Sequence, residues 1–297
     1  MTSMRLPEAK GTEFRPLLKR LDAEFDMPAD LQAGAVRVVT SRDLRVKVAL
    51  AYRLARAWFQ SSLARRGARP VLPPPLPGRP DHPVLLPPGR MPRRSASGLK
   101  GRIALIHALA HIELAAVDLT FDLIARGCEE NFPRSFFDNW VQVGLEEAKH
   151  FAMLADRLEA LGSYYGALPA HDGLWQAGVE TAEDLTARMA LVPLVLEARG
   201  LDVTPSTINR LEASGDTESA AILKVIYRDE QKHVAFGAKW FRFLCDRERC
   251  APEPRFHALV RKHFRGQVKG PFNDRARAEA GLTPGFYKPL MPIARQF

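Results

Sequence analysis

The segments Glu147-Ala148-Lys149-His150 and Glu230-Gln231-Lys232-His233 repeat one pattern, in which a histidine follows a glutamate by three positions. Residues three apart on an α-helix project to the same side, so each glutamate and its histidine can share a metal ion. Apolar residues at helical spacing, such as Leu154 after the first segment and Ile226 before the second, mark that same side. Both pairs are therefore predicted to point into the core of a helical domain.

Two other glutamates stand in helical segments that are otherwise apolar on one side. Glu113 follows Ile106 and Ala110 at helical spacing, and Glu197 follows Leu194. An ionised carboxylate in an apolar interior is strongly disfavoured unless it is protonated, paired or bound to a metal. Metal coordination is favoured, because four carboxylates and two histidines are expected to converge. The predicted ligands are Glu113, Glu147, His150, Glu197, Glu230 and His233.

The order of all six residues along the chain is more specific evidence for a metal site than either Glu-x-x-His motif alone. A single Glu-x-x-His occurs often by chance, and residues 147–149 and 228–232 could be solvated charged faces, but that alternative leaves Glu113 and Glu197 unexplained. Ferritin-like di-iron proteins place one glutamate on each of two helices and a Glu-x-x-His on each of the other two. The chain follows this order, and the separations within its two halves are similar, 34 and 33 residues.

The sequence thus predicts an all-α fold, a ferritin-like four-helix bundle with a crossover connection between its halves. The four long helices are expected at residues 101–126, 133–161, 181–199 and 216–247. Gly127, Gly162 and Gly200 are predicted to end the first three, and Asp216 to cap the fourth. The dipeptide Thr204-Pro205 predicts a separate short helix between the last two. No segment predicts a strand.

Ten prolines lie between Pro70 and Pro92, which excludes a helix there and favours an extended polyproline conformation. Before this segment, apolar residues recur at helical spacing over residues 41–66. Four parts are expected: an N-terminal helical extension at residues 1–69, a proline-rich linker or strap at 70–98, the four-helix bundle at 99–250, and a C-terminal helix and tail at 251–297.

Four phrases extend the pattern beyond the ligands: His111–Ala115, Glu147–Phe151, Glu197–Pro205 and Asp229–Val234. With them the chain resembles an uncharacterised bacterial ferritin-like family that is known only as a domain of unknown function. The resemblance extends to about Leu244, and the phrase at 197–205 is its most specific part. It implies the fold and the metal site, and it brings no settled reaction.

Carboxylate and imidazole ligands without thiolates suit iron or manganese better than structural zinc. Two iron ions are the expected cofactor, with manganese or a mixed pair of manganese and iron as open alternatives. The three cysteines, Cys128, Cys245 and Cys250, form no Cys-x-x-Cys pair. They predict neither a disulfide framework nor a thiolate zinc site.

The ligand set favours a di-iron oxidoreductase of the oxygenase or oxidase type, which activates O2 or peroxide with the help of an electron donor and oxidises an unidentified substrate. Iron handling or peroxide detoxification is a second hypothesis. A third is a hydroxylase of modified tRNA, because residues 1–100 carry 19 Lys and Arg against 8 Asp and Glu, and residues 251–297 carry 9 against 3. Solvated basic helices are favoured over an RNA contact. A structural metal site is a fourth hypothesis, and no catalytic side chain beyond the ligands is assigned.

Tyr227, His107 and His171 are candidates for contacts around the metal ligands, with ordinary packing or a surface turn as the alternative for each. Pro193 falls four residues before Glu197 in the third predicted helix. There it removes a backbone donor and is expected to distort the helix, which could open a coordination position.

Residues 1–10 lack an apolar signal-peptide core, and no stretch reaches about 18 uninterrupted apolar residues. A cytoplasmic protein without a membrane span is therefore expected. The substrate, the reductant and the oligomeric state do not follow from the sequence.

Overall fold

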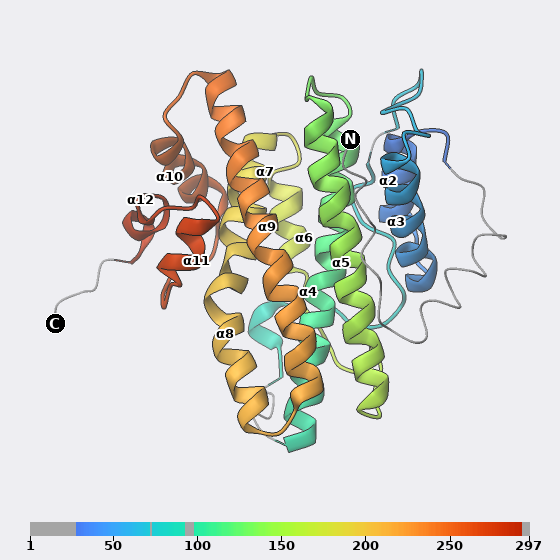
Figure 1. Ribbon diagram of the computed structural model, residues 1–297, viewed down its shortest axis with the longest axis vertical. Coiled ribbons are helices and arrows are strands. Elements are labelled where there is room, and N and C mark those ends of the chain that lie inside the picture. Colours follow the sequence, from blue (N-terminus) through green and yellow to red (C-terminus); the bar gives the residue numbers. More distant parts are fainter. Residues whose placement is uncertain (1–27, 72, 93–97, 293–297) are drawn as a thin grey trace. The chain divides into compact units, whose positions relative to one another are not determined.

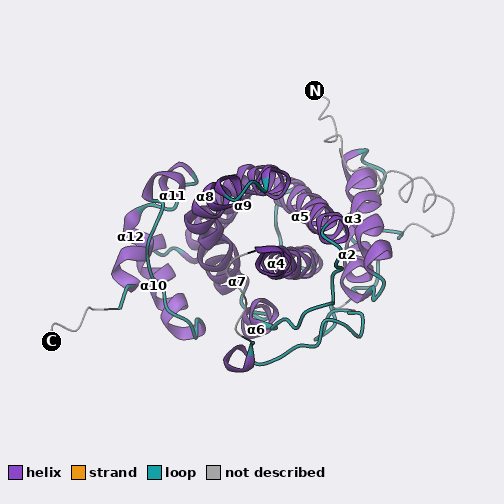
Figure 2. Cartoon of the chain, turned by 90° about the horizontal axis from the view of Figure 1, so that it is seen from below, coloured by secondary structure: helices purple, strands orange, loops and turns teal. Residues whose placement is uncertain are grey.

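The computed structural model describes residues 28–71, 73–92 and 98–292, and every regular element within these ranges is a helix. Figure 2 shows helices and loops and no strand in this part of the chain, so the all-α prediction is confirmed. Residues 1–27 of the predicted N-terminal extension and residues 293–297 of the predicted tail lie outside the described residues. The described residues form two compact units: the first combines those within 28–86, 90–131 and 144–170, and the second those within 87–89, 132–143 and 171–292.

The first unit contains α2 (Leu31–Thr40), α3 (Leu44–Phe59) and α4 (Gly98–Gly127). α2 packs against both α3 and α4, and Figure 1 shows α2 beside α3. The carboxylates of Asp30 and Asp43 cap α2 and α3 by accepting hydrogen bonds from backbone N–H groups of the first turns. The helix predicted at 41–66 is wrong at both ends, because Asp43 starts α3 and Ser61 adopts a left-handed conformation (φ 57°) just after it.

Within the described ranges, α4 is the one helix that is long and apolar enough to cross a membrane by length and composition, with a mean hydropathy of 1.5 over its most apolar window. In the structure 72% of that window is buried, as in the core helix of a globular domain. The helix therefore gives no clear membrane span. Three acidic side chains are nevertheless buried along it: Glu113, Asp118 and Asp122.

A buried ion pair links α3 to α4. The side chains of Lys47 and Asp118 are almost fully excluded from solvent, and the ammonium of Lys47 contacts the carboxylate of Asp118. The same ammonium donates a hydrogen bond to the backbone oxygen of Val39 in α2 (3.1 Å). Burial lowers the pKa of Lys47, and the negative charge of Asp118 acts in the opposite direction. One charged contact thus joins three helices of this unit.

Asp118→Ala is expected to lower the free energy of unfolding by about 3–5 kcal/mol, because it leaves the Lys47 ammonium buried without this carboxylate. Denaturant unfolding followed by circular dichroism measures the change. Arg275→Ala is the control, since Arg275 pairs with Glu279 on an exposed helical face, where solvent screens the attraction between the two charges. The double change Lys47→Met with Asp118→Leu removes both charges and is expected to recover most of the loss. A loss at Asp118 no larger than at Arg275 contradicts this role of the pair.

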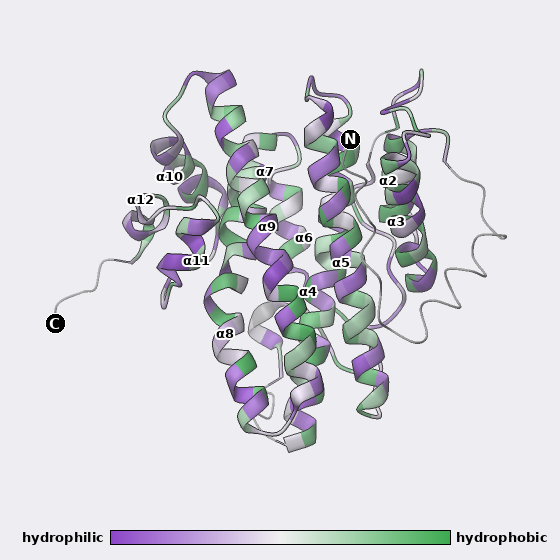
Figure 3. Cartoon of the chain, viewed as in Figure 1, coloured by the Kyte–Doolittle hydropathy of each residue, from purple (hydrophilic) through white to green (hydrophobic). Residues whose placement is uncertain are grey.

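The second unit contains α6 (Gly173–Glu180), α7 (Leu185–Leu191), the π-helix η2 (Val192–Glu197), α8 (Ala198–Ala213), α9 (Thr217–Glu248), α10 (Pro252–His263), α11 (Asp274–Glu279), α12 (Pro284–Tyr287) and η3 (Lys288–Leu290). α8 packs along α9, as Figure 1 shows. Figure 3 shows hydrophobic and hydrophilic residues alternating along both, as expected for helices with one buried face. α5 (Arg134–Ala160) begins in this unit and continues into the first after Val143, and the short turn η1 (Pro88–Arg90) precedes α4 in the sequence.

The cap of α9 is confirmed, whereas two predicted helix boundaries before it are wrong. Asp216 accepts a hydrogen bond from the backbone N–H of Ser219 (3.1 Å), as an N-cap does. Gly200 does not end a helix, and no separate helix starts at Pro205, because both residues lie inside α8. A Cβ at Gly200 would lie 3.9 Å from Cγ of Glu230, so Gly200 faces α9. Packing against α9 overrides both local stop signals.

A second buried ion pair holds the C-terminal segment of this unit to α8. Arg277 in α11 donates two hydrogen bonds to the carboxylate of Asp202, at 2.8 and 2.7 Å, and both side chains are almost fully buried. Its guanidinium also lies over the rings of Phe272 and Tyr287. Arg199 donates hydrogen bonds to two backbone oxygens of the same segment. The phrase at 197–205 therefore contains residues that anchor the C-terminal segment.

Pro193 lies within η2, so the predicted distortion of the third helix is confirmed. A π-helical turn closes its hydrogen bonds one residue later than an α-helical turn. Gly237 of α9 faces the proline ring, and a Cβ at Gly237 would lie only 2.4 Å from Cβ of Pro193. Glycine at this position therefore allows α9 to approach the π turn closely.

Gly237→Ala is expected to lower the free energy of unfolding by about 1–3 kcal/mol, although alanine favours a helix over glycine by about 1 kcal/mol. The added methyl group overlaps the ring of Pro193, so η2 or α9 must shift. Gly89→Ala is the control, because a Cβ there meets no atom within 4 Å. Denaturant unfolding compares the two variants, and a Gly237→Ala chain as stable as the unaltered one would refute the close contact.

Candidate metal centre

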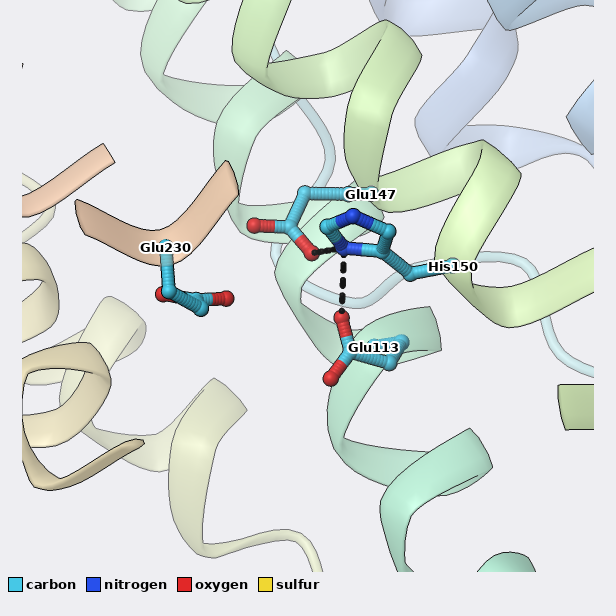
Figure 4. Close-up of side chains that lie close together, drawn as sticks. All are labelled: Glu113, Glu147, His150 and Glu230. Carbon is cyan, nitrogen blue, oxygen red and sulfur yellow. Dashed lines mark hydrogen bonds and ion pairs between the residues drawn. The ribbon is translucent and has the colours of Figure 1, made fainter. Parts of the chain in front are cut away.

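Three predicted ligands come together in the first unit, on α4 and α5. Nδ1 of His150 lies 3.2 Å from Oε2 of Glu113 and 3.6 Å from Oε2 of Glu147. One ligand atom from each residue lies within 4.8 Å of the other two. Figure 4 shows the three side chains pointing toward one another, with dashed lines from His150 to both carboxylates. These residues form a buried group, the α4–α5 cluster.

A glycine on α5 brings the two helices of the α4–α5 cluster close to each other. Glu147 and His150 lie about one turn apart on α5, and Gly144 lies about one turn before Glu147. A Cβ at Gly144 would lie 2.8 Å from Cε2 of Phe121 on α4. Because any larger residue would push the aromatic ring away, Gly144 helps to keep Glu113 within reach of His150.

The α4–α5 cluster could hold a metal ion. Two carboxylates and one imidazole suit divalent transition metal ions such as iron, manganese and zinc. Carboxylate oxygen and histidine nitrogen bind zinc at about 2.0–2.2 Å, so two ligands of such an ion lie at most about 4.4 Å apart. Both separations from His150 fall within this limit. All three residues are at most 4% exposed, and buried carboxylates require a compensating positive charge.

The other predicted ligands lie in the second unit. Nδ1 of His233 lies 3.7 Å from Oε1 of Glu230 on α9, and both residues are buried. Glu197 is half-buried at the end of η2, which packs against α9, and it precedes Gly200 by three residues. Figure 4 labels Glu230 as well. Each unit therefore contains a Glu-x-x-His pair on one helix and a further glutamate on a helix of the same unit.

His107, His171 and Tyr227 are the three candidates for contacts around the metal ligands, and each forms a hydrogen bond with a loop, turn or side chain. His107 accepts hydrogen bonds at Nε2 from two backbone N–H groups of the loop after α5, at 3.0 and 3.4 Å. His171 accepts one at Nδ1 from the N–H of Gly173, where α6 starts (3.2 Å). The hydroxyl of Tyr227 accepts one from the side chain of Asn273 (3.2 Å). These contacts describe packing and turns, and a role near a metal stays a prediction.

Sequence reasoning does not single out Tyr165, which lies close to the α4–α5 cluster in the first unit. Its hydroxyl forms a hydrogen bond with Nδ1 of His111 (2.8 Å), and its ring packs edge-on against Phe151, the residue after His150. Tyr165 lies in the irregular loop after α5, where no helical periodicity marks a position as buried. No sequence signal identifies such a residue.

Most of the chain matches a known family profile. The profile described as "Protein of unknown function (DUF455)" matches residues 40–288, a range that includes all six predicted ligands. The chain belongs to the DUF455 family. An uncharacterised protein of Haemophilus influenzae is 38% identical to it over 209 residues, which cover 69% of this chain and 73% of the relative. No solved structure matches it significantly. The resemblance to a family of unknown function is thus confirmed, and the ferritin-like character of this DUF455 chain stays a prediction.

In this DUF455 chain, Glu147→Gln is expected to weaken Mn2+ binding at least about tenfold, because a neutral amide replaces a charged ligand of the same size. A bound ion raises the melting temperature in a concentration-dependent way, so thermal unfolding against Mn2+ concentration gives the affinity. Glu146→Gln is the matched control, since Glu146 is a buried neighbour outside the α4–α5 cluster. Equal Mn2+ stabilisation of both variants would show that Glu147 is not a ligand.

Proposed function

We propose that the chain is a ferritin-like di-metal oxidoreductase that activates O2 or peroxide and oxidises a substrate. Two iron ions are the proposed cofactor, with manganese or a mixed pair of manganese and iron as the alternative. The observation that carries the proposal is the buried α4–α5 cluster, whose ligand atoms lie within 4.8 Å of one another. In the proposed fold, α4, α5, α9 and the continuous segment α7–η2–α8 form a four-helix bundle.

The second unit supports the proposal because it repeats the same set of ligand types. Glu230 and His233 correspond to Glu147 and His150, and Glu197 corresponds to the isolated glutamate of the first unit. When the two sets are combined, four carboxylates and two imidazoles are available for two metal ions. Four carboxylate charges also balance the four positive charges of two ferrous ions.

The π turn gives independent support. Single π turns within α-helices occur frequently at functional sites, where they change the direction of side chains. Glu197 is the last residue of η2, so its direction differs from that of a glutamate at the same distance along a regular α-helix. In the proposal this change leaves a coordination position for O2 or substrate.

Each ligand has a proposed task. When bound, a pair of reduced iron ions would supply the electrons for O2 activation. Glu113, Glu147, Glu197 and Glu230 would hold the two ions through carboxylate oxygens, and His150 and His233 would hold them through imidazole nitrogens. All of these ligands except the half-buried Glu197 are buried, which limits their contact with bulk water, so the charges of the buried carboxylates act in a medium of low polarity.

The proposal extends to the organisation of the chain. Residues 99–250 are proposed to form the bundle, with a helical extension at 1–69 and a proline-rich strap at 70–98 before it, and a helix and tail at 251–297 after it. An electron donor, an unidentified substrate and a cytoplasmic location are part of the same proposal.

Iron content and reaction with O2 test this function. Chain loaded anaerobically with Fe2+ and freed of unbound metal is expected to hold two irons, and to show an optical change when O2 is admitted. His233→Ala is expected to reduce the iron content to about one per chain, because it removes a ligand of one ion only. Lys232→Ala, which changes the neighbouring residue on α9, is the control.

Three other outcomes of the iron-loading experiment would contradict the proposed function. Absence of bound iron after loading refutes the six-ligand site. One bound iron with no response to O2 supports a structural metal site instead. Accumulation of many ferric ions per chain in a large assembly supports iron handling in place of substrate oxidation.

A further inference from the structure

Two of the three cysteines lie where α9 ends and the chain turns toward α10 in the second unit (Figure 1). Cys245 belongs to the end of α9, and Cys250 is the second residue after this helix. Both are free thiols in the structure. Their spacing matches no common metal-binding or redox motif, so the sequence alone gives no reason to pair them.

The backbone at the end of α9 places the two cysteines side by side. Arg249 adopts a left-handed conformation (φ 54°), and its N–H donates a hydrogen bond to the oxygen of Asp246 (3.1 Å). The N–H of Cys250 donates one to the oxygen of Cys245 (3.0 Å). These two hydrogen bonds form a Schellman motif, in which the side chains of the first and last residues frequently pack against each other. Here these residues are the two cysteines.

The two thiols are also in contact. The thiol of Cys250 lies 3.7 Å from the backbone oxygen of Cys245. Burial raises the pKa of Cys245, and the charge of Cys250 and a side-chain hydrogen bond between the two thiols act in the same direction. A disulfide requires Cα atoms less than about 7 Å apart and side chains that point toward each other. A pair that is hydrogen-bonded through its backbone and through its thiols meets both requirements.

The two cysteines differ in their access to solvent. Cys245 is fully buried, whereas Cys250 is half-buried. Oxidation-sensitive sites commonly combine one solvent-accessible cysteine with a neighbouring cysteine that completes a disulfide. An oxidant therefore reaches Cys250 first, and Cys245 is the thiol that lies next to it.

We propose that Cys245 and Cys250 form a reversible disulfide when the chain meets a peroxide. Cys250 first loses its proton to water, and its sulfur attacks one oxygen of hydrogen peroxide. The O–O bond breaks, hydroxide leaves, and Cys250 becomes a sulfenic acid. The sulfur of Cys245 then forms the S–S bond and displaces the second hydroxide. The two thiol protons convert both hydroxide ions to water, and two electrons pass from the sulfurs to the peroxide.

Oxidation would change the contacts of a carboxylate that joins three helices. Glu248 of α9 accepts hydrogen bonds from the hydroxyl of Thr186 in α7 and from Arg255 in α10. The thiol of Cys250 also donates to this carboxylate (3.9 Å), and a disulfide has no proton to donate. The proposed bond thus removes one contact of Glu248 and fixes the end of α9. It does not use the metal ligands, so it does not depend on the function proposed above.

Peroxide treatment of the full chain tests the proposal. The reduced chain is freed of reductant and treated with a small excess of hydrogen peroxide, and the remaining thiols are alkylated after unfolding. Mass spectrometry is expected to show a single chain that has lost two hydrogen atoms and carries one alkyl group in place of three. The alkylated thiol is expected to be Cys128, which is buried in the first unit and serves as the internal control.

Peptide mapping identifies the bond. Trypsin cleaves after Arg247 and Arg249, which lie between the two cysteines. Peptides 243–247 and 250–255 are therefore expected to stay linked until dithiothreitol is added. Cys245→Ala is expected to stop the reaction at the sulfenic acid of Cys250, which dimedone traps, and Cys128→Ala is the matched control that forms the bond as before.

The treatment of the unaltered chain stands even if a variant does not fold. Three alkylated thiols after peroxide treatment would overturn the proposal. A disulfide that includes Cys128, or one that joins two chains, would also overturn it. The same holds if Cys250 of the unaltered chain stays a sulfenic acid while Cys245 remains reduced.

Discussion

An ionised carboxylate inside an apolar core needs a compensating partner, and each of the three buried acids of α4 has one nearby. Asp118 meets the ammonium of Lys47 on α3, whereas Glu113 lies 3.2 Å from Nδ1 of His150 on α5, a ring that is a cation only when it is protonated. Asp122 accepts two hydrogen bonds from an arginine one turn later on the same helix, at 3.0 and 3.1 Å. Because desolvation of each charge costs several kcal/mol, these contacts fix the position of α4 more than they stabilise it. The partners of Glu113 and Asp118 on α5 and α3 therefore lie at defined positions along α4, whereas the partner of Asp122 lies on α4 itself.

The second unit also contains a buried carboxylate that needs a cation, and there the pair connects segments that are far apart in the sequence. Asp202 is buried on α8, and its cation is supplied by Arg277, which lies 75 residues further along the chain. The pair connects α8 to a segment that has little regular structure of its own. Aromatic rings on the guanidinium of Arg277 exclude water from the contact. The buried pair thus helps to fix where the C-terminal segment lies within this unit, together with the hydrogen bonds from Arg199.

The sequence predicts the features that depend on helical periodicity and fails where tertiary contacts decide. The α4–α5 cluster followed from the spacing of Glu147 and His150 and from the apolar residues around Glu113, because α-helical geometry fixes which side chains share a face. The stop predicted at Gly200 failed, since this glycine serves close packing against α9 and not a left-handed turn. Tyr165 could not be found, because a loop residue carries no periodic signal. The ferritin-like bundle and the full set of six ligands remain predictions.

The π turn at Val192–Glu197 has a consequence for the comparison of related sequences. One turn of this kind accommodates one residue more than regular α-helix does, and each residue beyond it is rotated by about 100°. A homologue without the π turn would keep a carboxylate in the same direction only if it had one residue fewer in this segment. In an alignment of this region, the number of residues in the segment therefore shows whether a related chain shares the π-turn geometry. The identity of the residues does not show it.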